Sequence, residues 1–170
     1  MYKKTTETDE PPSFFIPRRH MAWRSGGAVS GTGGPMILIV CIDDRGGMLF
    51  HHRRQSQDRV LREDLLREVR GAKLFMNAYS AKLFEADAPV TVAEDCLARA
   101  GTGDYCFVEN LDPLPYAAKL EQIIVYRWNR VYPADFYFDL PLETPEWTRT
   151  RTEEFAGSSH ERITKDVYTL

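Results

Sequence analysis

Two arginines stand side by side in the run FHHRRQSQDR, which spans residues 50–59. A guanidinium presents paired N–H donors that match a carboxylate or a phosphate. Arg53 and Arg54 are therefore candidates to bind an anionic group of a small-molecule ligand. The alternative is a solvent-exposed loop whose positive charge is neutralised by the acidic residues that follow it. The sequence leaves both interpretations open.

Asp58 is the candidate for proton transfer. At helical spacing it shares a face with Leu61, Leu65 and Val69, and we expect that face to be buried. A carboxylate held in an apolar cleft would have a raised pKa, which suits proton delivery near neutral pH. The alternative is a structural aspartate that interacts with the helix dipole or with an arginine. Asp64 is a weaker candidate because we expect it to project away from the Leu61 face.

Histidines and cysteines are too few and too scattered to form a metal-binding motif. His51 and His52 are adjacent, so their side chains diverge and cannot chelate one ion together. The sequence has no HExxH motif and no Cys/His cluster, so it predicts neither a zinc site nor a dinuclear metal nuclease. The three cysteines are far apart, and we expect them to be reduced thiols: Cys41, Cys96 and Cys106.

The composition is typical of an ordinary globular protein. Of its 170 residues, 43% are hydrophobic and 28% are charged, and the net charge of -3 supplies no field that attracts nucleic acid or anionic lipid. The longest apolar run, MILIVCI, is too short to span a bilayer, and no early apolar stretch resembles a signal peptide. We therefore expect a cytoplasmic protein without a membrane partner. A nucleic-acid-processing enzyme is a third, less favoured hypothesis, which only the arginine run supports.

Residues 1–35 differ from the rest of the chain. They are rich in Pro, Gly, Ser and Thr, and the run RSGGAVSGTGG has the composition of a flexible linker. We predict a disordered N-terminal extension over residues 1–35, followed by one compact domain over residues 36–170. The alternative is that the basic run PRRHMAWR docks on a partner.

Strands and helices alternate from residue 36 onward. A continuous apolar strand over residues 36–43 is typical of a central strand covered on both faces. Ser56 can cap a helix over residues 57–70, and Ser80 can cap a helix that ends near residue 86. The other predicted elements are strands at KLFM, VTV, DYCFV and QIIVYRW, a helix over residues 93–100, and closing strands near DFYF, WTRTRTEE and ITKDVYTL. This order predicts an α/β domain with a mixed, mostly parallel sheet, helices on both faces and a C-terminal antiparallel hairpin.

The order of elements, together with three stretches, resembles the dihydrofolate reductase family. MILIVCIDDRGGM is similar to the family's first strand and the start of its active-site loop, and AKLFMNAYSAKLFE to its second strand and the following helix. The segment from YPADFYFDL to ITKDVYTL is similar to its final strands. The resemblance implies NAD(P)H-dependent reduction of a pterin-like or other small heterocyclic substrate. It implies Asp58 as the proton-handling carboxylate, and Met48, Arg53 and Arg54 as residues near the substrate.

The same resemblance assigns positions to the cofactor NADPH. Ser80 matches the family's threonine beside the pyrophosphate, whereas Asn77 and Ala78 replace a Gly-Arg pair that holds phosphates. Glu109 and Asn110 replace a Gly-Gly pair whose bare backbone lets the pyrophosphate approach. The resemblance thus implies Ser80, Asn77 and Asn110 as cofactor-binding residues. The replacements favour a second hypothesis, a non-catalytic ligand-binding protein on the same scaffold.

Overall fold

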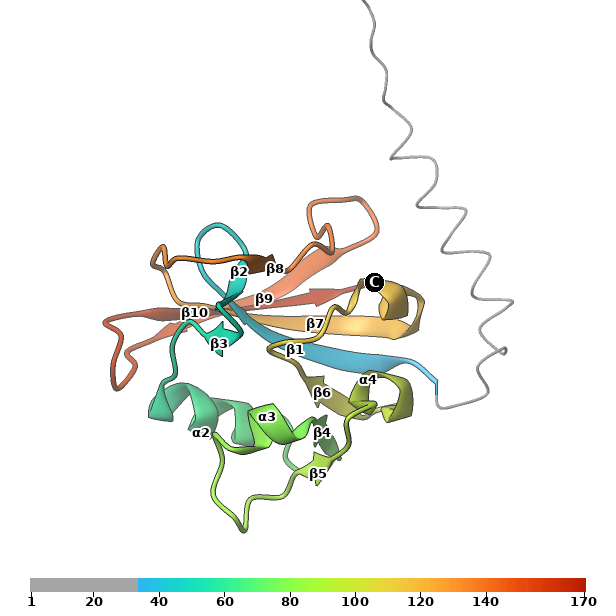
Figure 1. Cartoon of the computed structure of the whole chain (residues 1–170). Helices are drawn as coiled ribbons and strands as arrows, with labels where there is room; N and C mark the ends of the chain where they lie inside the picture. The colour runs from blue at the N-terminus through green and yellow to red at the C-terminus, as the bar shows by residue number, and fades with distance from the viewer. Residues whose placement is uncertain (1–33) are drawn as a thin grey trace, which may run out of the picture.

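The computed structural model describes residues 34–170 (Figure 1). The predicted disordered extension, and the alternative of a docking segment, fall almost entirely outside this range and stay predictions. The described residues form one continuous arrangement around a central sheet. None of the helices in this range is long and apolar enough to cross a bilayer.

A seven-stranded sheet organises the fold, in the order β5-β4-β6-β1-β7-β10-β9. The central strand β1 runs parallel to β6 and β7, and β4 runs parallel to β5 and β6. Only β10 reverses direction, and it pairs antiparallel with both β7 and β9. The predicted mixed, mostly parallel sheet with a closing hairpin is therefore confirmed. Its strands are β1 (Met36–Ile42), β4 (Leu74–Met76), β5 (Thr91–Val92), β6 (Tyr105–Phe107), β7 (Leu120–Arg127), β9 (Thr148–Phe155) and β10 (Ile163–Thr169).

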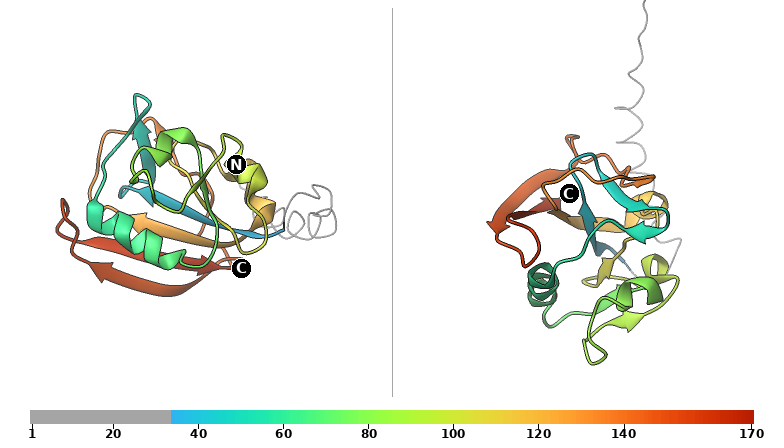
Figure 2. Two further views of the ribbon diagram at one scale, coloured as in Figure 1. Left: turned by 90° about the horizontal axis from the view of Figure 1, so that it is seen from below. Right: turned by 60° about the vertical axis from the view of Figure 1, so that its left-hand side comes forward.

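Both faces of the sheet are covered, because β1 alternates between two apolar clusters. Leu38 and Val40 lie in one cluster, which includes the residues of α4 (Cys96–Arg99) that point inward. Ile37 and Ile39 lie in the other, together with the inward face of α2 (Arg59–Glu68). Figure 2 shows α2 lying across its face of the sheet. The predicted burial of Leu61, Leu65 and Val69 is confirmed.

The helices are shorter than the sequence predicted. α2 begins at Arg59 with Asp58 as its N-cap, so the prediction that Ser56 caps this helix was wrong. α3 contains only Ala78–Ala81 and is capped by Asn77 instead of Ser80. After α3 the backbone tightens into turns with i to i+3 hydrogen bonds, such as that from the Leu83 N–H to the Ser80 carbonyl. A short 3₁₀ helix, η3 (Leu114–Lys119), precedes β7.

A second, three-stranded sheet combines two strands from a segment predicted as a loop with the strand predicted near DFYF. It consists of β2 (Gly47–Phe50), β3 (Arg53–Arg54) and β8 (Phe136–Tyr137), in the order β3-β2-β8. His51 and His52 form the turn between β2 and β3, and both have positive φ angles, of 52° and 63°. Two left-handed residues in a two-residue turn match the twist of a hairpin, but the usual signal is Asn-Gly. Because two histidines occupy the turn, the sequence did not reveal the hairpin that carries Arg54.

A buried ionic cluster joins α2 to the antiparallel strands. The ammonium group of Lys165 lies 2.8 Å from Asp64 and 2.9 Å from Glu68, and its side chain is only 3% exposed. The Tyr126 hydroxyl donates to the same Asp64 carboxylate at 2.7 Å. The expectation that Asp64 projects away from the core was wrong, since Lys165 and Tyr126 draw it against the sheet. Glu68 is bonded from its other side by Arg151 at 2.9 Å.

Candidate functional site

Polar side chains meet where β4 and β6 end. Asn77 follows β4, and Glu109 and Asn110 lie just beyond β6. Because these strands are parallel, their carboxyl ends lie at the same edge of the sheet, which is where ligands bind in many α/β folds. Arg54 reaches this edge from the β2–β3 hairpin.

Arg54 and Glu109 form the centre of the candidate site. Arg54 Nε donates to Glu109 Oε2 at 3.0 Å, and Arg54 Nη2 donates to Oε1 at 3.1 Å. The guanidinium carbon lies 4.4 Å from the centre of the Tyr79 ring, and the Tyr79 carbonyl accepts a further bond from Nη2 at 3.1 Å. The guanidinium is therefore held by a carboxylate in its plane and an aromatic ring against its face.

The other polar residues of the site support Glu109. Ser80 Oγ donates to Glu109 Oε1 at 2.8 Å. The Asn77 side chain accepts from the Ser80 N–H at 3.1 Å and donates to Asn110 Oδ1 at 2.8 Å. Four residues that the sequence marked as candidates thus come together around Glu109: Arg54, Asn77, Ser80 and Asn110.

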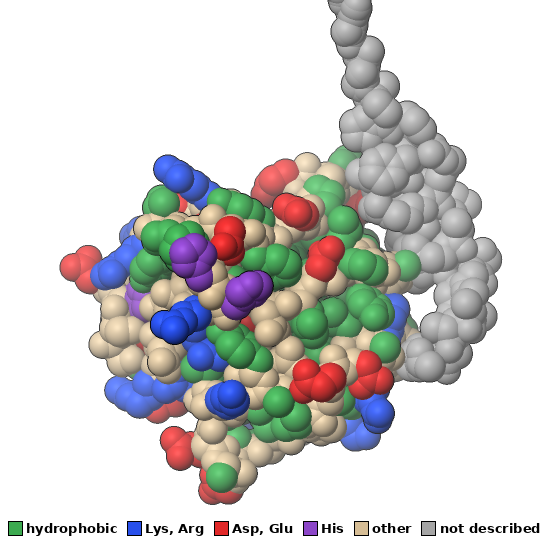
Figure 3. Space-filling view, viewed as in Figure 1, with side chains coloured by type: hydrophobic (Ala, Val, Ile, Leu, Met, Phe, Trp, Pro, Cys, Tyr) green, Lys and Arg blue, Asp and Glu red, His purple; other side chains and the backbone are tan. Residues whose placement is uncertain are grey.

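Two further candidates do not join this cluster. Arg53 is exposed on β3, and Met48 is buried among the apolar residues that pack against β1. The expectation that Met48 lies near a bound substrate stays a prediction, although its side chain packs in the core. Histidine side chains and basic side chains gather at the surface over β2 and β3, where the sequence has His51, His52 and Arg53 (Figure 3).

The cleft beside Glu109 is nearly closed. Its free volume is about 10 Å³, which is room for about one water molecule. Cys41 and Phe107 from the sheet, Leu61 from α2 and Trp128 after β7 are among the residues that line it. A ligand can enter only if side chains move. Arg54, which is half-buried, reaches the cleft through its contact with Glu109, one of the lining residues.

Asp58 also lines this cleft, but its pKa is shifted in the direction opposite to that expected. Its carboxylate accepts from the N–H groups of Leu61, Ser158 and Ser159, at 2.8–3.2 Å. Burial alone would raise the pKa of Asp58, but these donors and the ring of His160 outweigh it and hold the pKa well below its usual value. The expectation of a raised pKa was therefore wrong, and the alternative of a structural, helix-capping aspartate describes the contacts.

His160 connects Asp58 to the loop before α2. Its Nδ1 lies 3.1 Å from Asp58 Oδ2, and its Nε2 lies 3.1 Å from Ser56 Oγ and 3.0 Å from the Tyr132 hydroxyl. The imidazole stacks on Trp128 with the ring centres 4.5 Å apart. In the sequence this histidine stood in a polar turn, and no local signal joins it to a residue 102 positions earlier.

The lowered pKa of Asp58 predicts how the stability of the protein changes at acid pH. Because its folded-state pKa lies below the unfolded value of about 3.9, its contribution is complete above that pH and is lost as the pH falls through the folded pKa. Thermal melts from pH 7 to pH 2 should therefore show a shallower acid loss for Asp58→Asn than for the wild type. Asp95→Asn is the control: Arg99 also lowers the pKa of Asp95, but this carboxylate is exposed and screened by solvent, so the slope should stay close to that of the wild type. Parallel curves for Asp58→Asn and the wild type would contradict this assignment.

Comparisons with known proteins show which solved structure has a similar fold. No family model matches the sequence, and no curated protein matches it. Among solved structures, a dihydrofolate reductase from Enterococcus faecalis, complexed with NADP(H) and RAB-propyl, is similar with a TM-score of 0.55. The likeness covers 81% of this chain and 97% of that chain at 10% identity. The chain has a dihydrofolate reductase-like fold. At this identity the likeness concerns the fold alone, which agrees with the sequence resemblance.

NADPH does not fit the residues at its expected place in this dihydrofolate reductase-like fold. The N–H of Ala78, at the start of α3, already donates to the Glu94 carboxylate at 2.9 Å. Glu109 and Asn110, which the resemblance aligns with a Gly-Gly pair, carry side chains here, and the Glu109 carboxylate is already bonded by Arg54 and Ser80. Arg54 cannot serve as the missing phosphate ligand while Glu109 holds it in two hydrogen bonds.

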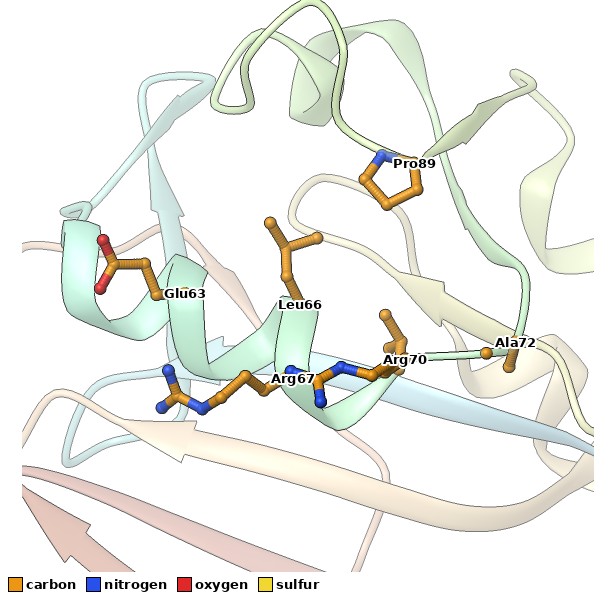
Figure 4. Close-up of a pocket in the computed structure, with 8 residues that line it drawn as sticks. Glu63, Leu66, Arg67, Arg70, Ala72 and Pro89 are labelled. Carbon is orange, nitrogen blue, oxygen red and sulfur yellow. The ribbon is translucent and has the colours of Figure 1, made fainter.

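A separate groove lies outside this site, on the far side of α2. It has a volume of about 480 Å³ and runs between the outer face of α2 and Pro89 (Figure 4). Arg67 at its wall is paired with Asp64 at 3.1 Å, whereas Leu66 supplies apolar surface. Within residues 34–170, no three His, Cys, Asp or Glu side chains lie together in a way that could hold a metal ion.

Proposed function

We propose that the protein binds a planar, cationic heterocycle on a reductase-like scaffold and does not use NADPH as a hydride donor. The proposal rests on the contacts of the Arg54 guanidinium. Glu109 accepts two parallel N–H donors from it, and Tyr79 lies against its face. A planar cation from outside the protein would find the same carboxylate and ring.

The chemistry of the ligand follows from the group that now occupies the site. A guanidinium and a protonated 2-aminopyrimidine both present two parallel N–H donors on a flat, delocalised cation. A carboxylate cannot distinguish them by hydrogen bonding alone. Pterin-like and diaminopyrimidine rings belong to this class, so the substrate class implied by the resemblance agrees with the proposed one, although Glu109 replaces Asp58 as its anchor.

In this proposal Arg54 fills the ligand site with its side chain when no ligand is bound. Its side chain is 22% exposed, against 8% for Glu109, so the guanidinium can swing into solvent without opening the apolar core. It stands on a two-residue strand at the edge of the small sheet. The ligand therefore competes with an internal cation, and exchange needs the movement of one side chain together with local widening of the cleft.

An NADPH-dependent reductase is the second candidate function. In its favour is the likeness to a dihydrofolate reductase that is described as complexed with NADP(H). Against it stand Glu94 and Glu109 beside the expected phosphate positions and a low pKa at the expected proton donor, Asp58. Binding of a heterocycle without hydride transfer requires neither a phosphate-binding site nor a proton donor.

A titration of the full chain distinguishes the two candidates. We expect 2,4-diaminopyrimidine to change the fluorescence of Trp128, which lines the cleft, and to raise the melting temperature. At a hundredfold excess over Kd the stabilisation should be about 2.7 kcal/mol. NADPH, NADH and dihydrofolate are titrated in parallel, and neither nucleotide should shift the melting temperature. A response to NADPH together with turnover of dihydrofolate would replace this proposal with the reductase.

A further inference from the structure

Ser56, His160 and Asp58 come together from three separate segments. Ser56 lies in the loop between β3 and α2, Asp58 caps α2, and His160 lies in the turn between β9 and β10. The distances are 3.1 Å from Ser56 Oγ to Nε2 of His160 and 3.1 Å from Nδ1 to Asp58 Oδ2. A hydroxyl, an imidazole and a carboxylate joined in this order are the arrangement that activates serine nucleophiles.

The protons on this chain of groups can be assigned from the contacts. The N–H groups of Ser158 and Ser159 donate to Asp58, so its carboxylate is ionised and can only accept. Nδ1 of His160 must therefore be the donor to Asp58, which leaves the lone pair of the neutral ring on Nε2. That nitrogen faces both Ser56 Oγ and the Tyr132 hydroxyl, at 3.1 and 3.0 Å, and it is the one that can take a proton from the Ser56 hydroxyl.

The surroundings hold this geometry in place. Trp128 stacks on the imidazole, and the Tyr132 hydroxyl lies 3.0 Å from Nε2, so the ring has little room to rotate. Gly157 brings the turn close to Asp58, because a Cβ at this position would collide with the carboxylate. His160 is buried with its side chain 2% exposed, whereas Ser56 is half-buried and faces the cleft. Ser56 is thus the more exposed of the two, and an ester can reach it only when the nearly closed cleft widens.

We propose that Ser56 is a nucleophile for acyl transfer from small esters, with His160 as its general base and Asp58 as the residue that positions the histidine. In the first step Ser56 Oγ forms a bond to the carbonyl carbon and its proton moves to Nε2. The ester C–O bond then breaks, and the leaving oxygen takes that proton. Water attacks the acyl-serine in the same way, which releases the acid and restores the hydroxyl. This activity goes beyond ligand binding at Glu109 and does not depend on it.

The test treats the folded full chain with a fluorophosphonate and, separately, with p-nitrophenyl acetate. Attack on the fluorophosphonate forms an Oγ–P bond and breaks the P–F bond, and the proton leaves with fluoride. We expect one adduct by intact mass, located on Ser56 by peptide mapping, and a burst of p-nitrophenol. The same chain unfolded in urea contains the same serines without the histidine contact, and it should label at least tenfold more slowly.

Variants separate the nucleophile, the base and the positioning residue. Ser56→Ala should lose the adduct, and His160→Gln, with its fold checked by circular dichroism, should label at least tenfold more slowly. Asp58→Asn should slow labelling of Ser56 in samples that are still folded, an effect that helix capping alone would not produce. Ser158→Ala is the matched control and should label like the wild type, because the Ser158 hydroxyl accepts from Arg59 and does not contact His160.

Two results would overturn the proposal. One is the absence of a Ser56 adduct on the folded wild-type chain at concentrations that label a known serine esterase. The other is equal labelling of the folded and the urea-unfolded chain, which would show that the contact with His160 does not activate the hydroxyl. The second comparison needs no variant, so it holds even if His160→Gln does not fold.

Discussion

Replacing Lys165 with methionine should lower the free energy of unfolding by about 3–5 kcal/mol, because it removes one partner from a buried ionic cluster. Asp64 and Glu68 would then face each other across the vacated position with no ammonium between them. Methionine conserves much of the volume, so the loss reports the charge rather than a cavity. Chemical denaturation with urea measures it directly.

The matched control for this prediction is an exposed ion pair. Arg99→Ala removes the partner of Asp95 at the start of α4, where both side chains are about 60% exposed, and should leave the free energy of unfolding close to that of the wild type. Similar losses for Lys165→Met and Arg99→Ala would show that the Lys165 cluster is not a buried, mutually dependent set.

Replacing Arg54 with alanine should weaken the fold and strengthen ligand binding. The change leaves the Glu109 carboxylate without its cation, and because Arg54 is partly exposed we expect a loss of about 1–3 kcal/mol. It also removes the internal competitor, so the affinity for 2,4-diaminopyrimidine should rise about tenfold or more. Calorimetric titration of both proteins gives the two dissociation constants, and denaturation gives the stability.

Arg53→Ala is the control for Arg54→Ala. Arg53 is the neighbouring residue on the same strand, but it is exposed and lies outside the Glu109 cluster, so its loss should leave affinity and stability close to the wild type. An equal or weaker affinity in Arg54→Ala would contradict the role of Arg54 as an internal occupant. A gain of affinity in both variants would point to a general effect of positive charge.

The central sheet and the α2 face could be predicted from the sequence, because both depend on local periodicity. The run MILIVCI has no polar residue, which is the pattern of a strand covered on two faces, and β1 is buried against both clusters. Leu61, Leu65 and Val69 repeat at helical spacing and lie against the sheet. Element ends were less predictable, since Ser56 and Asp58 before α2, and Asn77 and Ser80 before α3, are all residue types that cap helices, and the local sequence does not choose between them.

The candidate site was predictable in part. The charge of the arginine run marked Arg54, a family resemblance marked Asn77, Ser80 and Asn110, and the fold brings all four to one edge of the sheet. The sequence could not show that Glu109 holds Arg54, because the two residues are 55 positions apart and meet only through the β2–β3 hairpin. The contact of His160 with Asp58 could not be predicted either, because these two residues are 102 positions apart. The sign of the Asp58 pKa shift depends on N–H donors from the β9–β10 turn, which no pattern near Asp58 reveals.

The most direct test of the proposed function is calorimetric titration of 2,4-diaminopyrimidine into Arg54→Ala and into the double variant Arg54→Ala/Glu109→Gln. The single variant presents the free carboxylate, and the double variant retains the shape of the site but lacks its charge. Losing one partner of a buried, hydrogen-bonded charge pair costs about 2 kcal/mol or more, so the double variant should bind at least about thirtyfold more weakly. Equal affinities in the two variants, or binding of NADPH in place of the heterocycle, would contradict the account.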